Sequence, residues 1–74
     1  MPKLPVVKAR ELIRALQKEG FVIVIQVGSH VQLKHVDGRR TTVPFHAGKD
    51  IKPGTLLNIL RQINMTKADL QRIL

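Results

Sequence analysis

The stretch FVIVIQVGSHVQLKHVDGRRTTVP, residues 21–44, decides the fold, because it holds three strand-like segments separated by two turn signals. Residues 21–27 are mostly β-branched and apolar, which predicts a central strand. Gly28-Ser29 and Asp37-Gly38 are both typical of two-residue hairpin turns. We therefore predict an antiparallel sheet whose further strands cover residues 30–36 and 40–44.

The second predicted strand alternates between apolar and polar side chains, the pattern of a strand with one buried face. Val31 and Leu33 are expected to face the core. The opposite, open face is expected to carry His30, Gln32 and Lys34.

Segments with helical periodicity precede and follow the three predicted strands in the sequence. Apolar residues at helical spacing predict a first helix, which Gly20 ends. These residues are Ala9, Leu12, Ile13 and Leu16. Pro53 opens a second helix that Asn64 breaks, and Thr66 caps a short last helix. The prediction is one α+β domain over residues 1–74, ordered α-β-β-β-α with a short C-terminal helix. The helices pack on one face of the three-stranded sheet. Double-stranded RNA-binding domains have this order.

Composition narrows the possible partners. Thirteen Lys and Arg against five Asp and Glu give a formal net charge of +8 at pH 7. This excess favours a polyanion, with nucleic acid ahead of an acidic protein or an anionic membrane. Phe21 and Phe45 are the only aromatic residues apart from histidines, which argues against folds that stack bases on aromatic side chains. Contacts should go mainly to the phosphate-sugar backbone.

Cysteine is absent, which excludes disulfides and thiolate metal sites and fits a reducing cytosol. The sequence also has no recognisable signal peptide and no apolar stretch of the roughly 20 residues that cross a bilayer. We therefore expect a cytoplasmic protein that does not enter a membrane.

Several short motifs, in order and over nearly the whole chain, resemble the HicA family. They are Gly20-Phe21, Gly28-Ser29-His30, Asp37-Gly38-Arg39-Arg40, Val43-Pro44-Phe45-His46, the run from Gly48 to Leu56, and Ile59-Leu60-Arg61-Gln62. Each motif is weak alone, but their joint order and spacing are hard to obtain by chance. Two positions differ from many members of the family. Gln26-Val27 replaces a basic residue, and Val31 replaces a second histidine.

The resemblance implies a toxin of a type II toxin–antitoxin system, with the fold of double-stranded RNA-binding domains. It further implies an endoribonuclease that cleaves mRNA, blocks translation and is neutralised by a HicB-type antitoxin. The free toxin is expected to be a monomer and to form a hetero-oligomer with the antitoxin. The histidine of the Gly-Ser-His motif is the catalytic one in the family, and it corresponds to His30 in this sequence.

Elementary chemistry supports His30 as well. RNA carries its own nucleophile, the 2′-hydroxyl, and histidine is the side chain that titrates near neutral pH and can remove its proton. Gly28 has no side chain to obstruct an approaching phosphate. Neither a metal ion nor another cofactor is then required. Without the resemblance, the residues alone favour the simpler interpretation of His30 as an exposed polar strand residue.

The remaining site predictions concern RNA contacts. The predicted RNA-binding residues are Gly28, Ser29, Lys34, Arg39, Arg40, His46, Lys49 and Lys52. The two lysines Lys49 and Lys52 precede a helix N-terminus, which attracts phosphate. His46 either orders its loop or contacts phosphate, with supply of the catalytic acid as the second choice. Asp50 is expected to form a local ion pair or cap, and His35 to be structural.

Two other functions remain open from the sequence. The first is a non-catalytic RNA-binding module that represses its target sterically. The second is a DNA-binding regulator, which lacks support because the segment around Asn64 has no helix-turn-helix spacing.

Overall fold

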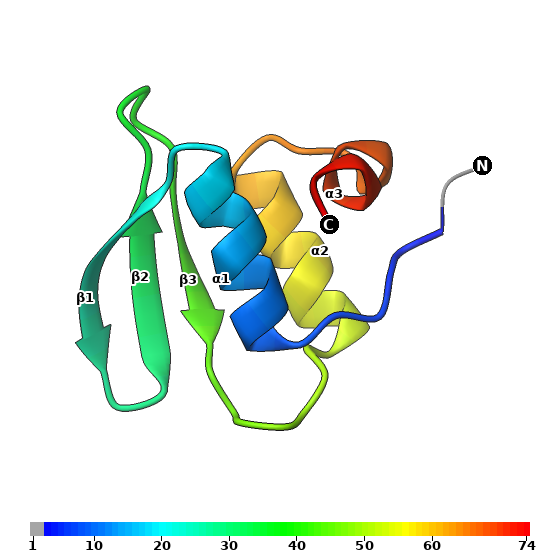
Figure 1. Ribbon diagram of the computed structural model, residues 1–74, viewed down its shortest axis with the longest axis horizontal. Helices are drawn as coiled ribbons and strands as arrows, with labels where there is room; N and C mark the ends of the chain where they lie inside the picture. The colour runs from blue at the N-terminus through cyan, green and yellow to red at the C-terminus, as the bar shows by residue number, and fades with distance from the viewer. Residues whose placement is uncertain (1–2) are drawn as a thin grey trace.

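The computed structural model describes residues 3–74 and has the predicted order of elements. They are α1 (Ala9–Lys18), β1 (Val22–Val27), β2 (His30–Lys34), β3 (Arg40–Pro44), α2 (Pro53–Gln62) and α3 (Lys67–Ile73). The three strands form one antiparallel sheet in the order β1-β2-β3, and all the helices lie on one side of it (Figure 1). The α+β fold predicted from the sequence is confirmed.

Alternation divides the sheet into two faces. Val31 and Leu33 of β2 and Val43 of β3 are buried against the helices, whereas His30 and Lys34 are exposed. Figure 1 shows the sheet and the helices as two layers, with the helices to the right of the strands. We call the uncovered side of the sheet the outer face.

The core lies between the sheet and the two longer helices. Leu12 and Leu16 of α1 and Leu56 and Ile59 of α2 are almost fully buried. These positions recur at helical spacing, so burial of one stripe on each helix stabilises helix and sheet together. Leu70 of α3 joins the same cluster. No helix among residues 3–74 has the length and apolar character that crossing a bilayer requires.

The position of β1 differs from the prediction of a central strand. Within residues 3–74, β1 pairs only with β2 and forms an edge of the sheet, and all six of its residues are exposed. The five apolar side chains retain 47–60% exposure. Four of them are consecutive, from Val22 to Ile25, and the helix layer leaves this strand largely uncovered (Figure 1). A bulge between Ile23 and Ile25 interrupts the register with β2.

The loop between β2 and β3 is also longer than predicted. β2 ends at Lys34 rather than Val36, which is 97% exposed. The Gly38 N–H donates to the His35 carbonyl at 3.0 Å, and Gly38 itself has a φ of +97°. A four-residue turn, 35–38, whose last residue is a left-handed glycine therefore replaces the predicted two-residue turn.

Gly20 ends α1 as predicted, through a Schellman motif. Its N–H donates to the Gln17 carbonyl at 3.1 Å, and the Phe21 N–H donates to the Leu16 carbonyl at 3.0 Å. Gly20 has a φ of +97°, the left-handed conformation that glycine adopts without steric cost. The motif turns the chain directly from α1 into β1.

Replacing Gly20 with alanine should destabilise the domain by about 2 kcal/mol, as the sum of left-handed strain and a steric clash. A Cβ atom at this position would lie 2.9 Å from Nε2 of His35, which is itself hydrogen-bonded to the Glu19 carbonyl at 3.0 Å. Urea unfolding, monitored by circular dichroism, measures this loss in the free energy of unfolding.

Gly38→Ala is the matched control, because Gly38 has the same φ but its Cβ would meet nothing within 4 Å. We expect this control to lose only the strain component, about 1 kcal/mol. Equal losses in the two variants would exclude a steric contribution from His35.

The short last helix is capped as predicted. Thr66 Oγ1 accepts a hydrogen bond from the Asp69 N–H at 3.0 Å, and Asp69 Oδ2 accepts one from the Thr66 N–H at 2.9 Å. The bond from the Thr66 backbone is the main reason that the pKa of Asp69 lies below its usual value. Asn64, with a φ of +57°, separates this helix from α2.

Candidate functional site

His30 is the first residue of β2, directly after the two-residue turn Gly28-Ser29. Gly28 has a φ of +58°, and Gln26 Nε2 donates to its carbonyl at 3.2 Å. The side chain of His30 lies on the exposed outer face, as predicted from the alternation. The sequence therefore places an exposed imidazole beside a tight turn at one end of the sheet.

The outer face is a small grid in which each β2 residue pairs with one residue on either side. The rows are Val22–Lys34–Arg40, Ile25–Gln32–Thr42 and Val27–His30–Pro44. None of these residues is acidic. The face therefore combines one histidine, two cations, two polar residues and an apolar column contributed by β1.

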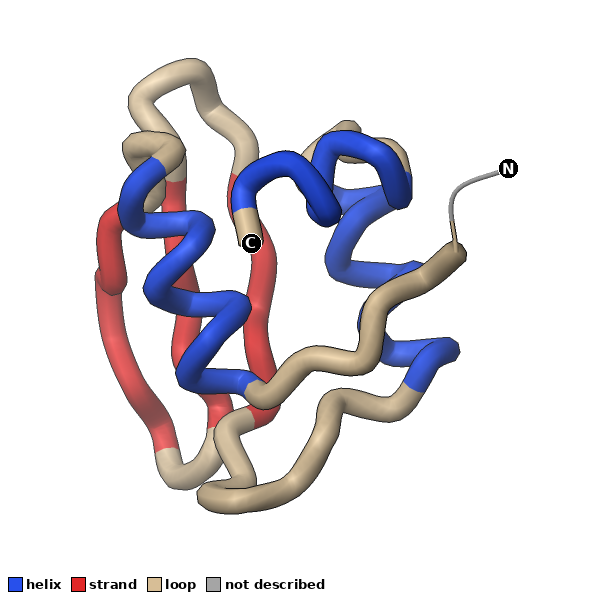
Figure 2. The backbone as a smooth tube through the Cα atoms, turned by 45° about the vertical axis from the view of Figure 1, so that its right-hand side comes forward, coloured by secondary structure: helices blue, strands red, loops and turns tan. Residues whose placement is uncertain are grey.

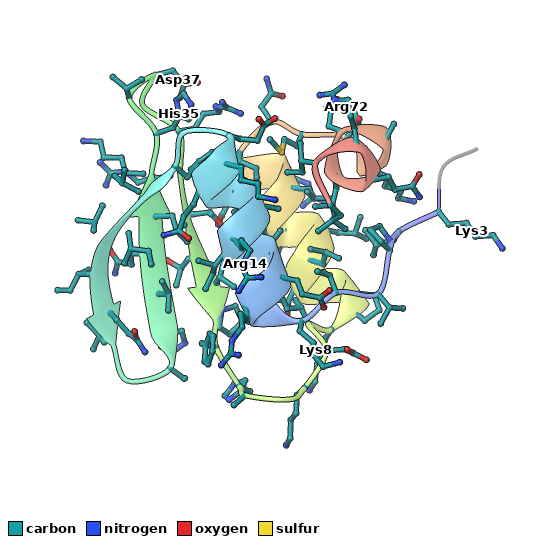
Figure 3. All side chains as sticks on the ribbon, in the orientation of Figure 1. Lys3, Lys8, Arg14, His35, Asp37 and Arg72 are labelled. Carbon is teal, nitrogen blue, oxygen red and sulfur yellow. The ribbon has the colours of Figure 1, made fainter. Side chains whose placement is uncertain are left out.

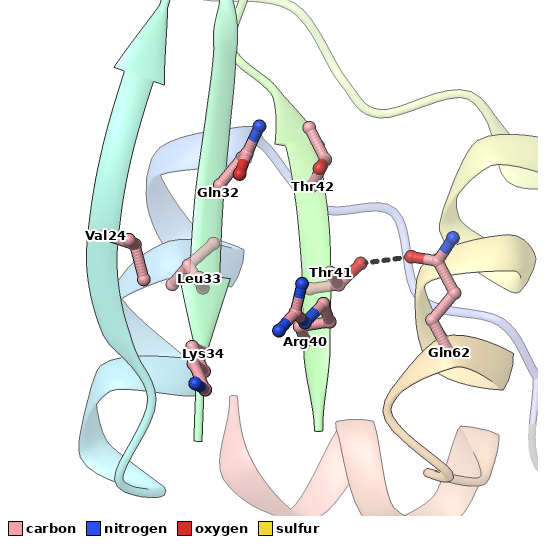
Figure 4. Close-up of a pocket in the computed structure, with 8 residues that line it drawn as sticks. All are labelled: Val24, Gln32, Leu33, Lys34, Arg40, Thr41, Thr42 and Gln62. Carbon is pink, nitrogen blue, oxygen red and sulfur yellow. Dashed lines mark hydrogen bonds between the residues drawn. The ribbon is translucent and has the colours of Figure 1, made fainter. Parts of the chain in front are cut away.

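Lys34 and Arg40 lie directly opposite each other on β2 and β3 (Figure 4). They line a shallow depression of about 300 Å³ together with Gln32, Thr42 and other residues of the sheet. Like charges at paired positions repel each other and destabilise a sheet. Two adjacent cations without a carboxylate are therefore an arrangement suited to an external anion.

On the inner side of the sheet, a side-chain hydrogen bond joins β3 to α2. The Thr41 hydroxyl donates to Gln62 Oε1 at 2.6 Å, the dashed line in Figure 4. Thr41 is buried, so this hydrogen bond satisfies a polar group on the inner side of the sheet. Sequence reasoning missed this contact, since its partners are 21 residues apart and belong to different elements.

His46 lies in the loop between β3 and α2, at the same end of the sheet as the β1–β2 turn (Figure 2). The Phe45 N–H donates to the Ser29 carbonyl at 2.5 Å, which ties this loop to that turn. His46 lines a depression of about 220 Å³ against the start of α1, where Lys8 and Arg10 also lie. Arg10 was not among the predicted contacts, because only the tertiary fold brings α1 beside this loop.

Lys49 and Lys52 are both exposed before α2, as predicted. Lys52 is the residue that precedes the helix, and its side chain makes no capping bond there. Asp50 does form an ion pair, but its partner is Lys8 at 3.6 Å rather than a neighbouring lysine. A backbone bond from Ile51 to Val7 holds the same two segments together.

Arg39 differs from the other predicted contacts, because its guanidinium is engaged within the protein. Its Nε lies 2.8 Å from Asp37 Oδ2, its Nη1 donates to the Ile63 carbonyl at 2.9 Å, and it stacks 5.1 Å from the Phe21 ring centre. The backbone N–H of Arg39 is the main cause that lowers the pKa of Asp37 below its usual value. These contacts give Arg39 a role in anchoring the β2–β3 loop.

His35 has the structural role predicted for it. Its ring makes an edge-on contact with Phe21 at 5.0 Å, and Nε2 is hydrogen-bonded to the Glu19 carbonyl. The Asp37 N–H donates to Nδ1 at 3.1 Å. Figure 3 shows His35 and Asp37 at the end of the sheet away from the β1–β2 turn.

The two departures from the common family pattern have different surroundings. Val31 is buried in the core, so the side chain after His30 faces away from the outer face. Gln26 holds the Gly28 carbonyl and stabilises the turn. His30 itself is exposed beside both residues.

Most of the positive charge is uncompensated. Among residues 3–74, ion pairs to carboxylates involve Lys8, Arg39 and Arg72. The described cations outside such pairs are Lys3, Arg10, Arg14, Lys18, Lys34, Arg40, Lys49, Lys52, Arg61 and Lys67. Arg14 is exposed on α1 (Figure 3), so basic side chains occur on both layers of the molecule.

One known protein family matches most of the chain. The profile of the family described as the HicA toxin of bacterial toxin–antitoxin systems matches residues 9–65, from the start of α1 to the residue before the last helix cap. No curated protein matches the chain significantly. Since the match covers far more than half of the sequence, the chain belongs to the HicA toxin family.

Proposed function

We propose that this chain is an endoribonuclease toxin that cleaves mRNA, with His30 as the general base. The observation that carries the proposal is the exposed imidazole of His30 on an outer face that has cations and no carboxylate. Membership of a toxin family makes an enzyme that disables a cellular component the natural expectation.

The chemistry follows from the substrate. His30 removes the proton of a 2′-hydroxyl, and that oxygen attacks the neighbouring phosphorus. The bond from phosphorus to the 5′-oxygen breaks, and this oxygen takes up a proton as it leaves. The products are a 2′,3′-cyclic phosphate on one fragment and a 5′-hydroxyl on the other. Every bond change uses groups of RNA, the imidazole and water.

Phosphates of the RNA are held on both sides of His30. Lys34 and Arg40 offer the paired cations of the outer face, and the Gly28-Ser29 turn lets the backbone approach closely. Lys49 and Lys52 lie before α2, where free N–H groups and the helix dipole also attract phosphate. Arg39 is left out of this set because its guanidinium is already bound.

His46 is assigned to phosphate contact or loop ordering rather than to acid catalysis. Its loop is tied to the turn before His30 through the bond between Phe45 and Ser29. A phosphate held near His46 therefore has a fixed relation to the one attacked near His30.

The protein partner is a HicB-type antitoxin. A toxin–antitoxin pair requires a protein that blocks the toxin, and the basic outer face favours acidic side chains on that partner. We propose a monomeric free toxin that acts in the cytoplasm and forms a hetero-oligomer with its antitoxin.

The test is cleavage of a defined mRNA by the purified chain in EDTA, at a stated salt concentration. We expect cuts whose fragments end in a 2′,3′-cyclic phosphate and a 5′-hydroxyl. A 2′-deoxy substitution at one cut position should abolish cleavage there, because it removes the nucleophile, and leave the other cuts unchanged.

Cleavage that persists at the 2′-deoxy position would contradict the mechanism. Tight binding of the mRNA without any cleavage would indicate a non-catalytic RNA-binding module. Preference for duplex DNA over RNA at matched salt would instead indicate a DNA-binding regulator.

A further inference from the structure

The edge strand β1 carries exposed apolar side chains to which the proposed cleavage of RNA gives no role. Its six residues, VIVIQV, include no charge and no proline, and all are exposed. Proteins usually protect such an edge with charges, prolines or a covering segment, because its free backbone groups pair readily with another chain. An uncovered apolar edge of this kind marks an interaction surface.

Three of the exposed residues of β1 continue the grid of the outer face. Val22, Ile25 and Val27 pair with Lys34, Gln32 and His30 respectively, so the three apolar side chains form one column beside the polar one. Figure 4 shows β1 next to β2, with Lys34 and Arg40 on the strands beyond it. A ligand for this surface therefore needs apolar side chains at the edge and negative charge toward β2 and β3.

Nucleic acid does not fit the column, since the column offers neither a cation nor a polar side chain to a phosphate. A second copy of the chain fits poorly as well, because each copy carries a formal charge of +8. The bulge at Val24 further shortens the regular stretch available for pairing two identical edges. An acidic protein segment in extended conformation satisfies both the apolar and the charge requirement.

We propose that β1 is the docking strand for the antitoxin, which adds an acidic, extended segment to the edge of the sheet. Apolar side chains of that segment cover Val22, Ile25 and Val27, and its carboxylates point toward Lys34 on β2. The added strand lies about 10 Å from β2, two strand spacings, so a long acidic side chain and Lys34 can meet above β1. Arg40, one strand further away on β3, adds to the positive field that attracts the segment. The identity of the partner rests on the proposed function, whereas its chemistry rests on the surface.

Strand addition at this edge also places the partner beside the row of His30. Val27 is the cross-strand neighbour of His30, so a segment that covers Val27 narrows access to the imidazole from that side. The same contact then provides both recognition and inhibition.

The double variant Val22→Thr/Ile25→Thr tests the docking strand. Threonine keeps β-branching and nearly the volume of valine, and both positions are exposed, so the fold should be retained. We expect affinity for the purified cognate antitoxin, measured by calorimetry, to fall at least about tenfold. RNA cleavage by the free toxin should stay at the parent rate.

Val6→Thr/Val36→Thr is the matched control, because these valines are 80% and 97% exposed and lie outside the sheet. Its affinity for the antitoxin should equal that of the parent. If the double variant in β1 binds as tightly as this control, the docking strand is wrong, whether or not the chain cleaves RNA.

Hydrogen exchange supplies a readout specific to strand pairing. Outward-facing amides of β1 should exchange rapidly in the free toxin and become protected in the complex, while those of the 35–39 loop stay unchanged. Complex formation without protection in β1 would overturn strand addition. Sedimentation that finds a dimer of the parent alone, lost in the β1 variant, would assign the edge to a second copy and also overturn the proposal.

Discussion

Replacing His30 with alanine should lower the rate of RNA cleavage by roughly 10²- to 10⁴-fold, the usual contribution of one positioned general base. His30 is exposed and belongs to no buried cluster, so its loss should change the free energy of unfolding by less than about 0.5 kcal/mol. Binding of RNA should persist, because the cations supply most of it. Single-turnover cleavage and filter binding measure the two effects separately.

Gln32→Ala provides the control for His30→Ala. Gln32 is the next exposed residue on the outer face, and it lies in the row beside that of His30. This control should cleave RNA at nearly the parent rate. A His30→Ala variant that cleaves as fast as Gln32→Ala would remove the histidine from the mechanism. Equal, large losses in both variants would point to a disturbed surface rather than a lost base.

Replacing Phe21 with alanine should cost about 3–5 kcal/mol of the free energy of unfolding, the typical loss for a buried phenylalanine. Phe21 is 1% exposed in the core cluster. Its ring also contacts His35 at 5.0 Å and Arg39 at 5.1 Å, so its removal loosens the β2–β3 loop as well. A small domain has a total stability of about 5 kcal/mol or little more, so the variant should be largely unfolded or close to it.

Urea unfolding, or the loss of circular dichroism without urea, measures this effect. Phe21→Leu is the companion variant, because it keeps most of the apolar volume and loses mainly the aromatic contacts. We expect its loss to be about 1 kcal/mol, well below that of the alanine variant. An alanine variant with the parent's unfolding midpoint would show that Phe21 is not a principal part of the core.

Much of the fold could be predicted because local signals and global packing agree. The alternation in β2 identified the buried side of the sheet, and Gly20 and Thr66 marked helix ends through their own backbone chemistry. The sequence could not predict whether β1 is a central strand or an edge strand of the sheet. A continuous apolar run is equally compatible with a central strand and with an edge that binds a partner, and only the extent of the helix layer decides between them.

The candidate site, too, could be predicted only in part. The exposure of His30 and Lys34 followed from the period of the strand. The engagement of Arg39 did not, since its partners Ile63 and Phe21 are brought together only by the folded chain. The same holds for Arg10 beside His46. Sequence patterns therefore predicted which face of the strand each side chain occupies better than whether its charge is free.

The neighbours His30 and Val31 occupy opposite sides of the sheet, one exposed and one buried. Because a strand repeats every two residues, a shift of one residue in the β2 register exchanges these two environments. The imidazole would enter the core and the valine would face the solvent. The length of the turn before His30 therefore determines which side chains of β2 face the solvent. Loss or gain of a single residue in that turn would disturb both the packing of the core and the position of the imidazole.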